Sequence, residues 1–127
     1  MTSAHRREAL EDLVLLRRPV AEAVDAVRRH PWDSETELIT LTRVDATRLL
    51  DAFASGTVTA PDCESWANAV EGRDDIGLEE GAEALLKDFL FELSTPEATR
   101  GLTSTTADEW RRRIRSECRP RPSKDGP

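Results

Sequence analysis

The chain has 127 residues, 38% of them hydrophobic, and a net charge of −7, which fits one domain with its own core. The negative charge argues against general nucleic-acid binding, which needs clustered Lys and Arg to displace counterions from phosphates. No apolar run approaches the length of a membrane-spanning helix, and the two distant cysteines form neither a disulfide framework nor a zinc motif.

The first residues, MTSAHRREALEDL, lack the continuous apolar stretch of a signal peptide. Two widely spaced cysteines are more typical of reduced thiols than of a stapled secreted domain. The sequence therefore predicts a cytoplasmic protein.

Two helices are predicted before residue 31. Leucines and a valine follow helical spacing in the first 18 residues, and Pro19 either breaks this helix or opens the next one. Residues 19–29 carry a valine and alanine stripe. His30 precedes Pro31, and a residue before proline is pushed out of the helical region, so the second helix should end there.

Residues 31–41 are ambiguous. Trp32 is expected to anchor this segment by packing onto the helices. Residues 37–41 alternate partly between polar and apolar, as an extended segment does. Because one isolated strand is unstable, the segment is interpreted as a loop or a short helical turn.

The third and fourth helices are predicted over residues 42–55 and 59–72. Thr42 precedes Asp45 by three positions, which resembles a capping box. Thr59 is the predicted cap of the next helix, with Asp62 three residues after it. Gly56 is suited to the left-handed position after a helix. The short connection predicts that these two helices are antiparallel neighbours.

The most apolar helix is predicted over residues 78–93, where apolar residues recur at spacings of four, three, four and four. Gly81 falls inside this helix and should weaken it. Ala107, Trp110 and Ile114 mark a last helix.

These elements predict an all-α domain over residues 1–118, an irregular antiparallel bundle of about five helices, followed by a disordered Pro-rich tail over residues 119–127. The predicted core consists of Val24, Val27, Leu49, Leu50, Phe53, Trp66, Val70, Leu85, Phe89, Leu93, Trp110 and Ile114.

The densest charge lies between Glu71 and Glu92, with eight acidic and only two basic residues. Acids here can be a solvated helix entry, since carboxylates stabilise a helix N-terminus, or a surface that binds a basic partner. The segment lacks the spacing of an EF-hand loop, so no metal is expected. The candidate binding residues are Asp74, Asp75, Glu79, Glu80 and Glu83.

No other residue type suggests chemistry. His5 and His30 have no nucleophile at a recognisable spacing; a charged His30 would suit its helix end. Cys63 fits a small core residue, and Cys118 lies near the tail. The arginines of residues 111–121 are expected to pair with the acidic segment or with solvent rather than with nucleic acid. Neither catalysis nor a cofactor is expected.

The middle of the chain resembles the colicin D-type immunity proteins, small acidic helical proteins that bind and block a bacterial nuclease toxin. The likeness rests on Phe53 to Thr59 (FASGTVT), followed by Trp66 and an acidic stretch, and covers roughly residues 49–93. Cys63 departs from the aromatic that the family tends to carry there, and the Arg-rich last helix is a second departure. The resemblance implies a non-catalytic inhibitor whose acidic face occupies a cationic RNA-binding cleft.

The leading prediction is an acidic protein-binding module with a basic protein partner, most concretely an immunity-type inhibitor of a basic bacterial toxin. The alternative is a structural or regulatory homodimer formed through the apolar face of residues 85–93. A third hypothesis is an enzyme that holds a metal in the acidic cluster. No nucleic acid or membrane is expected as a partner.

Overall fold

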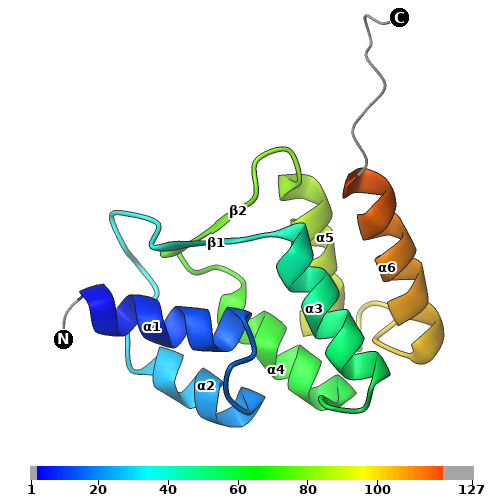
Figure 1. Cartoon of the computed structure of the whole chain (residues 1–127), viewed down its shortest axis with the longest axis horizontal. Coiled ribbons are helices and arrows are strands. Elements are labelled where there is room, and N and C mark those ends of the chain that lie inside the picture. Colours follow the sequence, from blue (N-terminus) through cyan, green and yellow to red (C-terminus); the bar gives the residue numbers. More distant parts are fainter. Residues whose placement is uncertain (1–2, 119–127) are drawn as a thin grey trace, which may run out of the picture.

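The computed structural model describes residues 3–118, with side chains from residue 4 to residue 116. This part of the chain forms six helices and two short strands (Figure 1). The elements are α1 (Ser3–Val14), α2 (Val20–Arg28), β1 (Ile39–Leu41), α3 (Arg43–Ala54), α4 (Ala60–Val70), β2 (Ile76–Leu78), α5 (Glu83–Ser94) and α6 (Ser104–Cys118). The mainly helical class is confirmed; the predicted tail, residues 119–127, lies outside the described residues.

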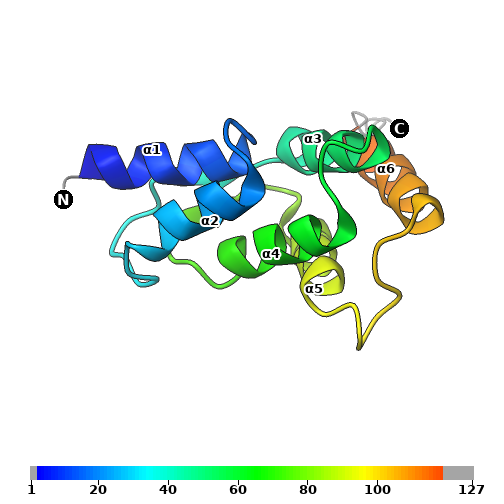
Figure 2. The same cartoon turned by 90° about the horizontal axis from the view of Figure 1, so that it is seen from below.

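Helix α4 is central to the packing of the helices. Helix α1 packs on α2, and α4 packs against both α2 and α5. Helix α3 packs mainly on α6 and less extensively on α4, so the predicted neighbours α3 and α4 are in contact, although the main partner of α3 is α6. Figure 2 shows α1 and α2 at one end of the molecule and α6 at the other.

The predicted capping box at Thr42 and the predicted cap at Thr59 are confirmed. The Thr42 hydroxyl accepts the Asp45 N–H at 3.2 Å, and the Asp45 carboxylate accepts the Thr42 N–H at 2.9 Å. Thr59 and Asp62 make the same pair of bonds at the start of α4. Gly56, with φ of +84°, adopts the left-handed conformation between the two helices.

The segment before α5 differs from the prediction. Leu78, the predicted start of a helix, instead ends β2 (residues 76–78), which pairs in parallel with β1, with Ile39 opposite Ile76. Helix α5 begins only at Glu83, because Gly81 has φ of +87°, outside the right-handed helical region. The interpretation of the segment as a loop or helical turn was therefore wrong for residues 39–41, which form β1.

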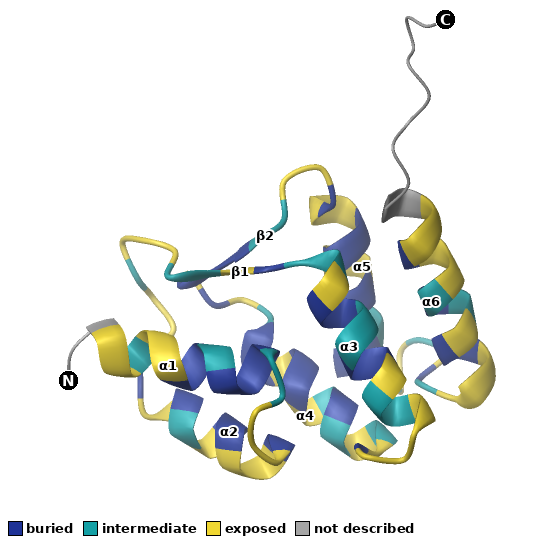
Figure 3. Cartoon of the chain, in the orientation of Figure 1, coloured by how far each residue is buried: buried dark blue, intermediate teal, exposed yellow. Residues whose placement is uncertain are grey.

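The core is built around three aromatic rings. Phe89 makes edge-to-face contacts with Trp66 and Trp110, with ring centroids 6.5 and 5.3 Å apart. Every predicted core residue is buried except Phe53, which is partly buried against the core. Figure 3 shows the buried residues on the facing sides of the helices. Trp32, which was predicted to anchor its segment, is 46% exposed.

Candidate functional site

The acidic segment is anchored by a buried ion cluster around Asp75. One Asp75 carboxylate oxygen accepts from Arg6 Nε at 2.8 Å and from Arg73 Nη2 at 3.0 Å, and the other accepts from Arg73 Nε at 2.9 Å. The side chains of Asp75 and Arg73 are 0% and 1% exposed. Asp75 therefore joins α1 to the segment before β2 and presents no surface to a partner.

The same two arginines hold the loop that follows α2. Arg6 donates to the carbonyls of Pro31 and Asp33 at 2.8 and 2.9 Å, and Arg73 donates to the Pro31 carbonyl at 2.8 Å. The Trp32 ring lies over the Arg73 guanidinium, 5.2 Å from centroid to carbon, a cation–π contact. Trp32 thus covers the ion cluster rather than packing into the apolar core.

The environment keeps Asp75 ionised. Burial alone would raise the pKa of this carboxyl, because it disfavours the charged form. The hydrogen bonds and charges of Arg73 and Arg6 outweigh the burial and hold the pKa below its ordinary value. The cluster is consequently a charged structural unit at neutral pH.

Glu79 also has a structural role. Its carboxylate accepts Arg43 Nη2 at 2.6 Å and the Arg43 backbone N–H at 2.8 Å. The second bond satisfies an N–H in the first turn of α3, which has no partner within the helix. Hydrogen bonds from Arg43 lower the pKa of Glu79, so this half-buried pair links β2 to α3.

Asp74, Glu80 and Glu83, the other predicted binding residues, are exposed. Within residues 3–118, the Asp74 and Glu80 carboxylates have no hydrogen-bond or ion-pair partner. Glu83 accepts the Gly81 N–H at 3.0 Å. The predicted five-residue acidic surface is therefore reduced to three carboxylates, because Asp75 and Glu79 are committed to arginines of the same chain.

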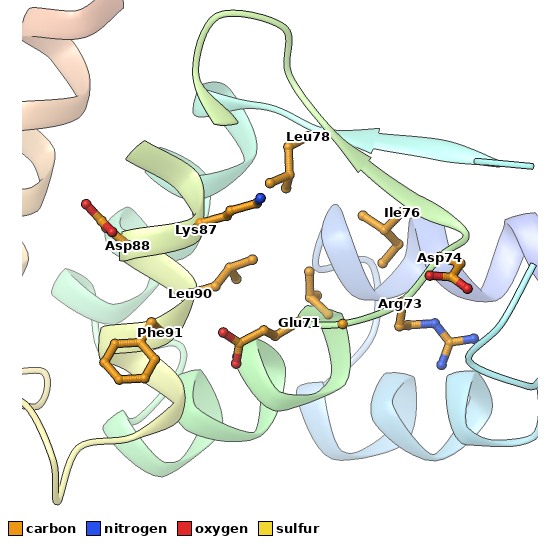
Figure 4. A pocket seen from close by; sticks show the side chains of 11 residues that line it. Glu71, Arg73, Asp74, Ile76, Leu78, Lys87, Asp88, Leu90 and Phe91 are labelled. Carbon is orange, nitrogen blue, oxygen red and sulfur yellow. The ribbon is translucent and has the colours of Figure 1, made fainter. Parts of the chain in front are cut away.

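A groove lies between this segment and α5. It has a volume of about 530 Å³. One wall consists of residues 70–74 with Ile76 and Leu78, and the other consists of Lys87, Asp88, Leu90 and Phe91. In Figure 4 the side chains of Ile76, Leu78 and Leu90 surround the same space, and Lys87 extends from α5 toward β2. We refer to this site as the α5–β2 groove.

The α5–β2 groove combines an apolar floor with an acidic rim. Asp74 is exposed at one end, and its carboxylate has no partner among the described residues. Glu71 accepts a hydrogen bond from the Ser94 hydroxyl at 2.9 Å, and Asp88 pairs with Arg113 of α6 at 3.2 Å. This second contact matches the predicted pairing of the Arg-rich helix with the acidic segment. Lys87 is the one exposed cation on the rim among the described residues.

Phe91 is the groove residue that the sequence interpretation missed. Its side chain is 51% exposed, whereas its neighbours Phe89, Leu90 and Leu93 are buried. Helical spacing places Phe91 off the apolar stripe of α5. The sequence alone therefore contains a signal of a surface site, namely a large aromatic residue outside the apolar stripe.

The described residues include neither a reactive cysteine nor a metal-binding cluster. Burial raises the pKa of the Cys63 thiol to about 12, so this predicted core residue stays a neutral thiol; the Cys118 side chain lies outside the described residues. No group of three or more His, Cys, Asp or Glu side chains in the described part is placed to hold a metal ion. None of the helices in residues 3–118 combines the length and apolarity needed to cross a membrane.

His30 is buried rather than exposed at its helix end. Burial lowers its pKa from the ordinary value of 6.5, and the charges of Arg6 and Arg73 lower it further, against a smaller opposite effect of Asp75. The sequence expectation of a favourable imidazolium at this position was therefore wrong. The helix end is shared with two guanidiniums, which repel a second positive charge.

Stability is expected to fall in two steps as the pH drops. The unfolded chain protonates its histidine at higher pH than folded His30 does, so stability is full above pH 6.5 and falls as the pH drops toward the lowered pKa. Asp75 and Glu79, whose pKa values are lowered, contribute stability that is lost below their ordinary values of 3.8 and 4.5. Urea denaturation across pH 3–8 measures both steps. His30→Gln should remove the upper step alone, and an unchanged slope between pH 5 and 6.5 would contradict this assignment.

No protein-family model matches the chain, and neither a curated protein nor a solved structure matches it. The resemblance to colicin D-type immunity proteins therefore stays a prediction.

Proposed function

We propose that the protein is a binding module for a basic protein partner, and that the α5–β2 groove is its contact surface. The observation that carries the proposal is the half-exposed Phe91 beside an apolar floor, with the unpaired Asp74 carboxylate on the rim. A partner with an apolar side chain and nearby Lys or Arg residues would fill the floor and neutralise the rim. In its finer form, the proposal is an immunity-type inhibitor that occupies the cationic cleft of a nuclease toxin.

The apolar floor and the acidic rim of the groove contribute to binding in different ways. When a partner covers a half-exposed aromatic side chain, a large apolar contact area is buried. Rim carboxylates contribute more to the association rate and to the choice of partner than to affinity. The exposed Glu80 and Glu83 extend the negative surface beyond the groove.

The apolar side chains of α5 that the alternative homodimer would use are buried within the single chain. Leu85, Leu86, Phe89, Leu90 and Leu93 are 5% exposed or less within the single chain. This face of α5 is covered by the chain itself, mainly by α4. A dimer through these five side chains would need the monomer core to open.

The proposal is tested by affinity capture from cells of the native organism, followed by titration of the identified partner. We expect Phe91→Ala to weaken binding of that partner by about 10- to 100-fold, the effect of removing a central aromatic contact. Asp74→Asn combined with Glu80→Gln and Glu83→Gln should slow association and reduce its dependence on salt concentration.

Two exposed residues that do not line the groove provide matched controls. Val44→Ala removes an apolar side chain that is 63% exposed on α3, and Asp25→Asn removes an exposed carboxylate on α2. Both variants should bind the partner as the wild type does. Equal loss of binding in the control and groove variants, or capture of no basic protein, would contradict the proposed function.

A further inference from the structure

Strand β2 has one paired edge and one edge without a neighbouring strand in the described residues. The Asp75 carbonyl accepts the N–H groups of Leu38 and Ile39 at 2.8 and 3.3 Å, and the Glu79 N–H donates to the Leu41 carbonyl at 2.9 Å. In a parallel ladder, alternate residues face the same neighbour. Residues 75, 77 and 79 therefore face β1, and Ile76 and Leu78 direct their backbone groups to the opposite edge.

The outward backbone groups on this edge lack strong hydrogen-bond partners among the described residues. Among the described residues, no turn or loop bond engages the Ile76 carbonyl, the Leu78 N–H or the Leu78 carbonyl. The Ile76 N–H makes only a long contact of 3.4 Å to the Arg73 carbonyl. An unpaired strand edge is a template for a further strand.

The α5–β2 groove adjoins this open edge. Side chains alternate across a strand, and a side chain added to Gly77 would meet the Glu37 carboxylate at 2.0 Å. Gly77 thus faces Glu37, whereas Ile76 and Leu78 face the groove. Figure 4 shows these two side chains directed from β2 toward α5. A strand added beside β2 would place every second side chain over the apolar floor.

The charge around the edge selects the kind of strand. The exposed carboxylates of Asp74 and Asp88 line the groove, and the exposed Glu80 is the second residue after β2. Lys87 is the single exposed opposing charge among the described groove residues. A strand that alternates apolar and basic side chains meets both requirements, because its apolar side chains enter the groove and its cations meet the carboxylates.

We propose that the partner binds by β-strand addition, in which an extended basic segment of the partner pairs with the open edge of β2 through Ile76 and Leu78. This inference rests on the proposed function and specifies how its groove is used. Main-chain hydrogen bonds to β2 would supply affinity, and the groove would select apolar side chains at alternate positions.

The test uses a blocked seven-residue peptide of alternating lysine and valine, with a glutamate–valine peptide as the charge control. Binding to the full chain is followed by fluorescence anisotropy, and amide exchange of Leu78 is followed by NMR. Two further lysine–valine peptides carry N-methyl groups, one on all odd positions and one on all even positions. Only one of these two sets of N–H groups faces β2 in an added strand.

We expect the lysine–valine peptide to bind, the glutamate–valine peptide not to bind, and one N-methylated peptide to lose at least about tenfold in affinity while the other keeps it. Exchange of the Leu78 amide should slow in the complex. Leu78→Pro, which removes the outward N–H, should bind at least about tenfold more weakly than Leu78→Ala, which keeps it. Thermal unfolding of both variants shows whether they fold, and the peptide comparison in the wild type does not depend on them.

The possible results separate the two proposals. Equal affinity of both N-methylated peptides, with unchanged Leu78 exchange, would overturn strand addition and leave a groove that binds basic segments through side chains alone. Binding of neither unmodified peptide, or equal binding of the basic and acidic ones, would overturn both strand addition and the proposed preference for a basic partner.

Discussion

Replacing Asp75 with asparagine is expected to lower the free energy of unfolding by about 3 kcal/mol or more. The substitution preserves shape but leaves the fully buried Arg73 and the mostly buried Arg6 without their counter-charge. Removing one partner of a buried ion pair costs about 3–5 kcal/mol, because the remaining charge stays desolvated. Urea denaturation at pH 7 measures the change, and the pH-dependent loss below pH 4 should shrink in the same variant.

The neighbouring residue supplies the control for this prediction. Asp74 has the same side chain one position earlier, but it is exposed and has no carboxylate partner in the described part of the chain. Asp74→Asn should change stability by no more than about 0.5 kcal/mol. If the two variants had equal stability, the Arg6–Asp75–Arg73 cluster would not be the anchor described above.

Phe89→Ala is expected to cost about 3–5 kcal/mol, the usual range for a large aromatic removed from a core. Phe89 is fully buried and lies between the rings of Trp66 and Trp110. Removing it creates a cavity at the centre of the aromatic cluster and eliminates both edge-to-face contacts. Urea denaturation measures the loss of stability, and near-ultraviolet circular dichroism should show a weaker tryptophan signal.

Phe91 provides the matched position two residues along the same helix. Because its side chain is 51% exposed, Phe91→Ala should cost about 1 kcal/mol or less. The two substitutions should therefore have different effects: Phe89→Ala should lower stability, and Phe91→Ala should weaken binding. A large loss of stability in Phe91→Ala would place this side chain in the core and remove it from the proposed site.

Local features of the fold could be predicted from the sequence. The caps at Thr42 and Thr59 depend on residues three positions apart, and the apolar stripe of α5 depends on spacings of three and four. Both are short-range patterns that a single sequence displays directly. The strands could not be predicted in this way. Neither three-residue segment is stable alone, and their partnership joins residues 39–41 to residues 76–78.

The candidate site shows the same limit. In the sequence, Asp74 and Asp75 are adjacent and chemically identical, so both were assigned to one surface. The difference between them depends on Arg6, which lies 69 residues from Asp75 in the chain. Long-range pairing of this kind leaves no periodic pattern. The exposed position of Phe91, by contrast, follows from helical spacing alone.

The ion cluster and the α5–β2 groove are parts of one arrangement. Asp75 directly precedes β2, and Arg73 belongs to the wall of the groove. The buried charges hold the segment that carries Ile76 and Leu78 against α1 and the loop after α2. Binding measurements on Asp75 variants therefore need a stability measurement beside them, whereas Phe91 and Asp74 variants test the surface directly.

The most direct test of the central claim is a hydrogen-exchange footprint of the protein in complex with its captured basic partner. We expect slower exchange in residues 70–78 and 87–91, the two walls of the α5–β2 groove, with little change in α2. Protection confined to α2 or α6, with unchanged exchange along β2 and α5, would contradict the assignment of the groove as the binding surface.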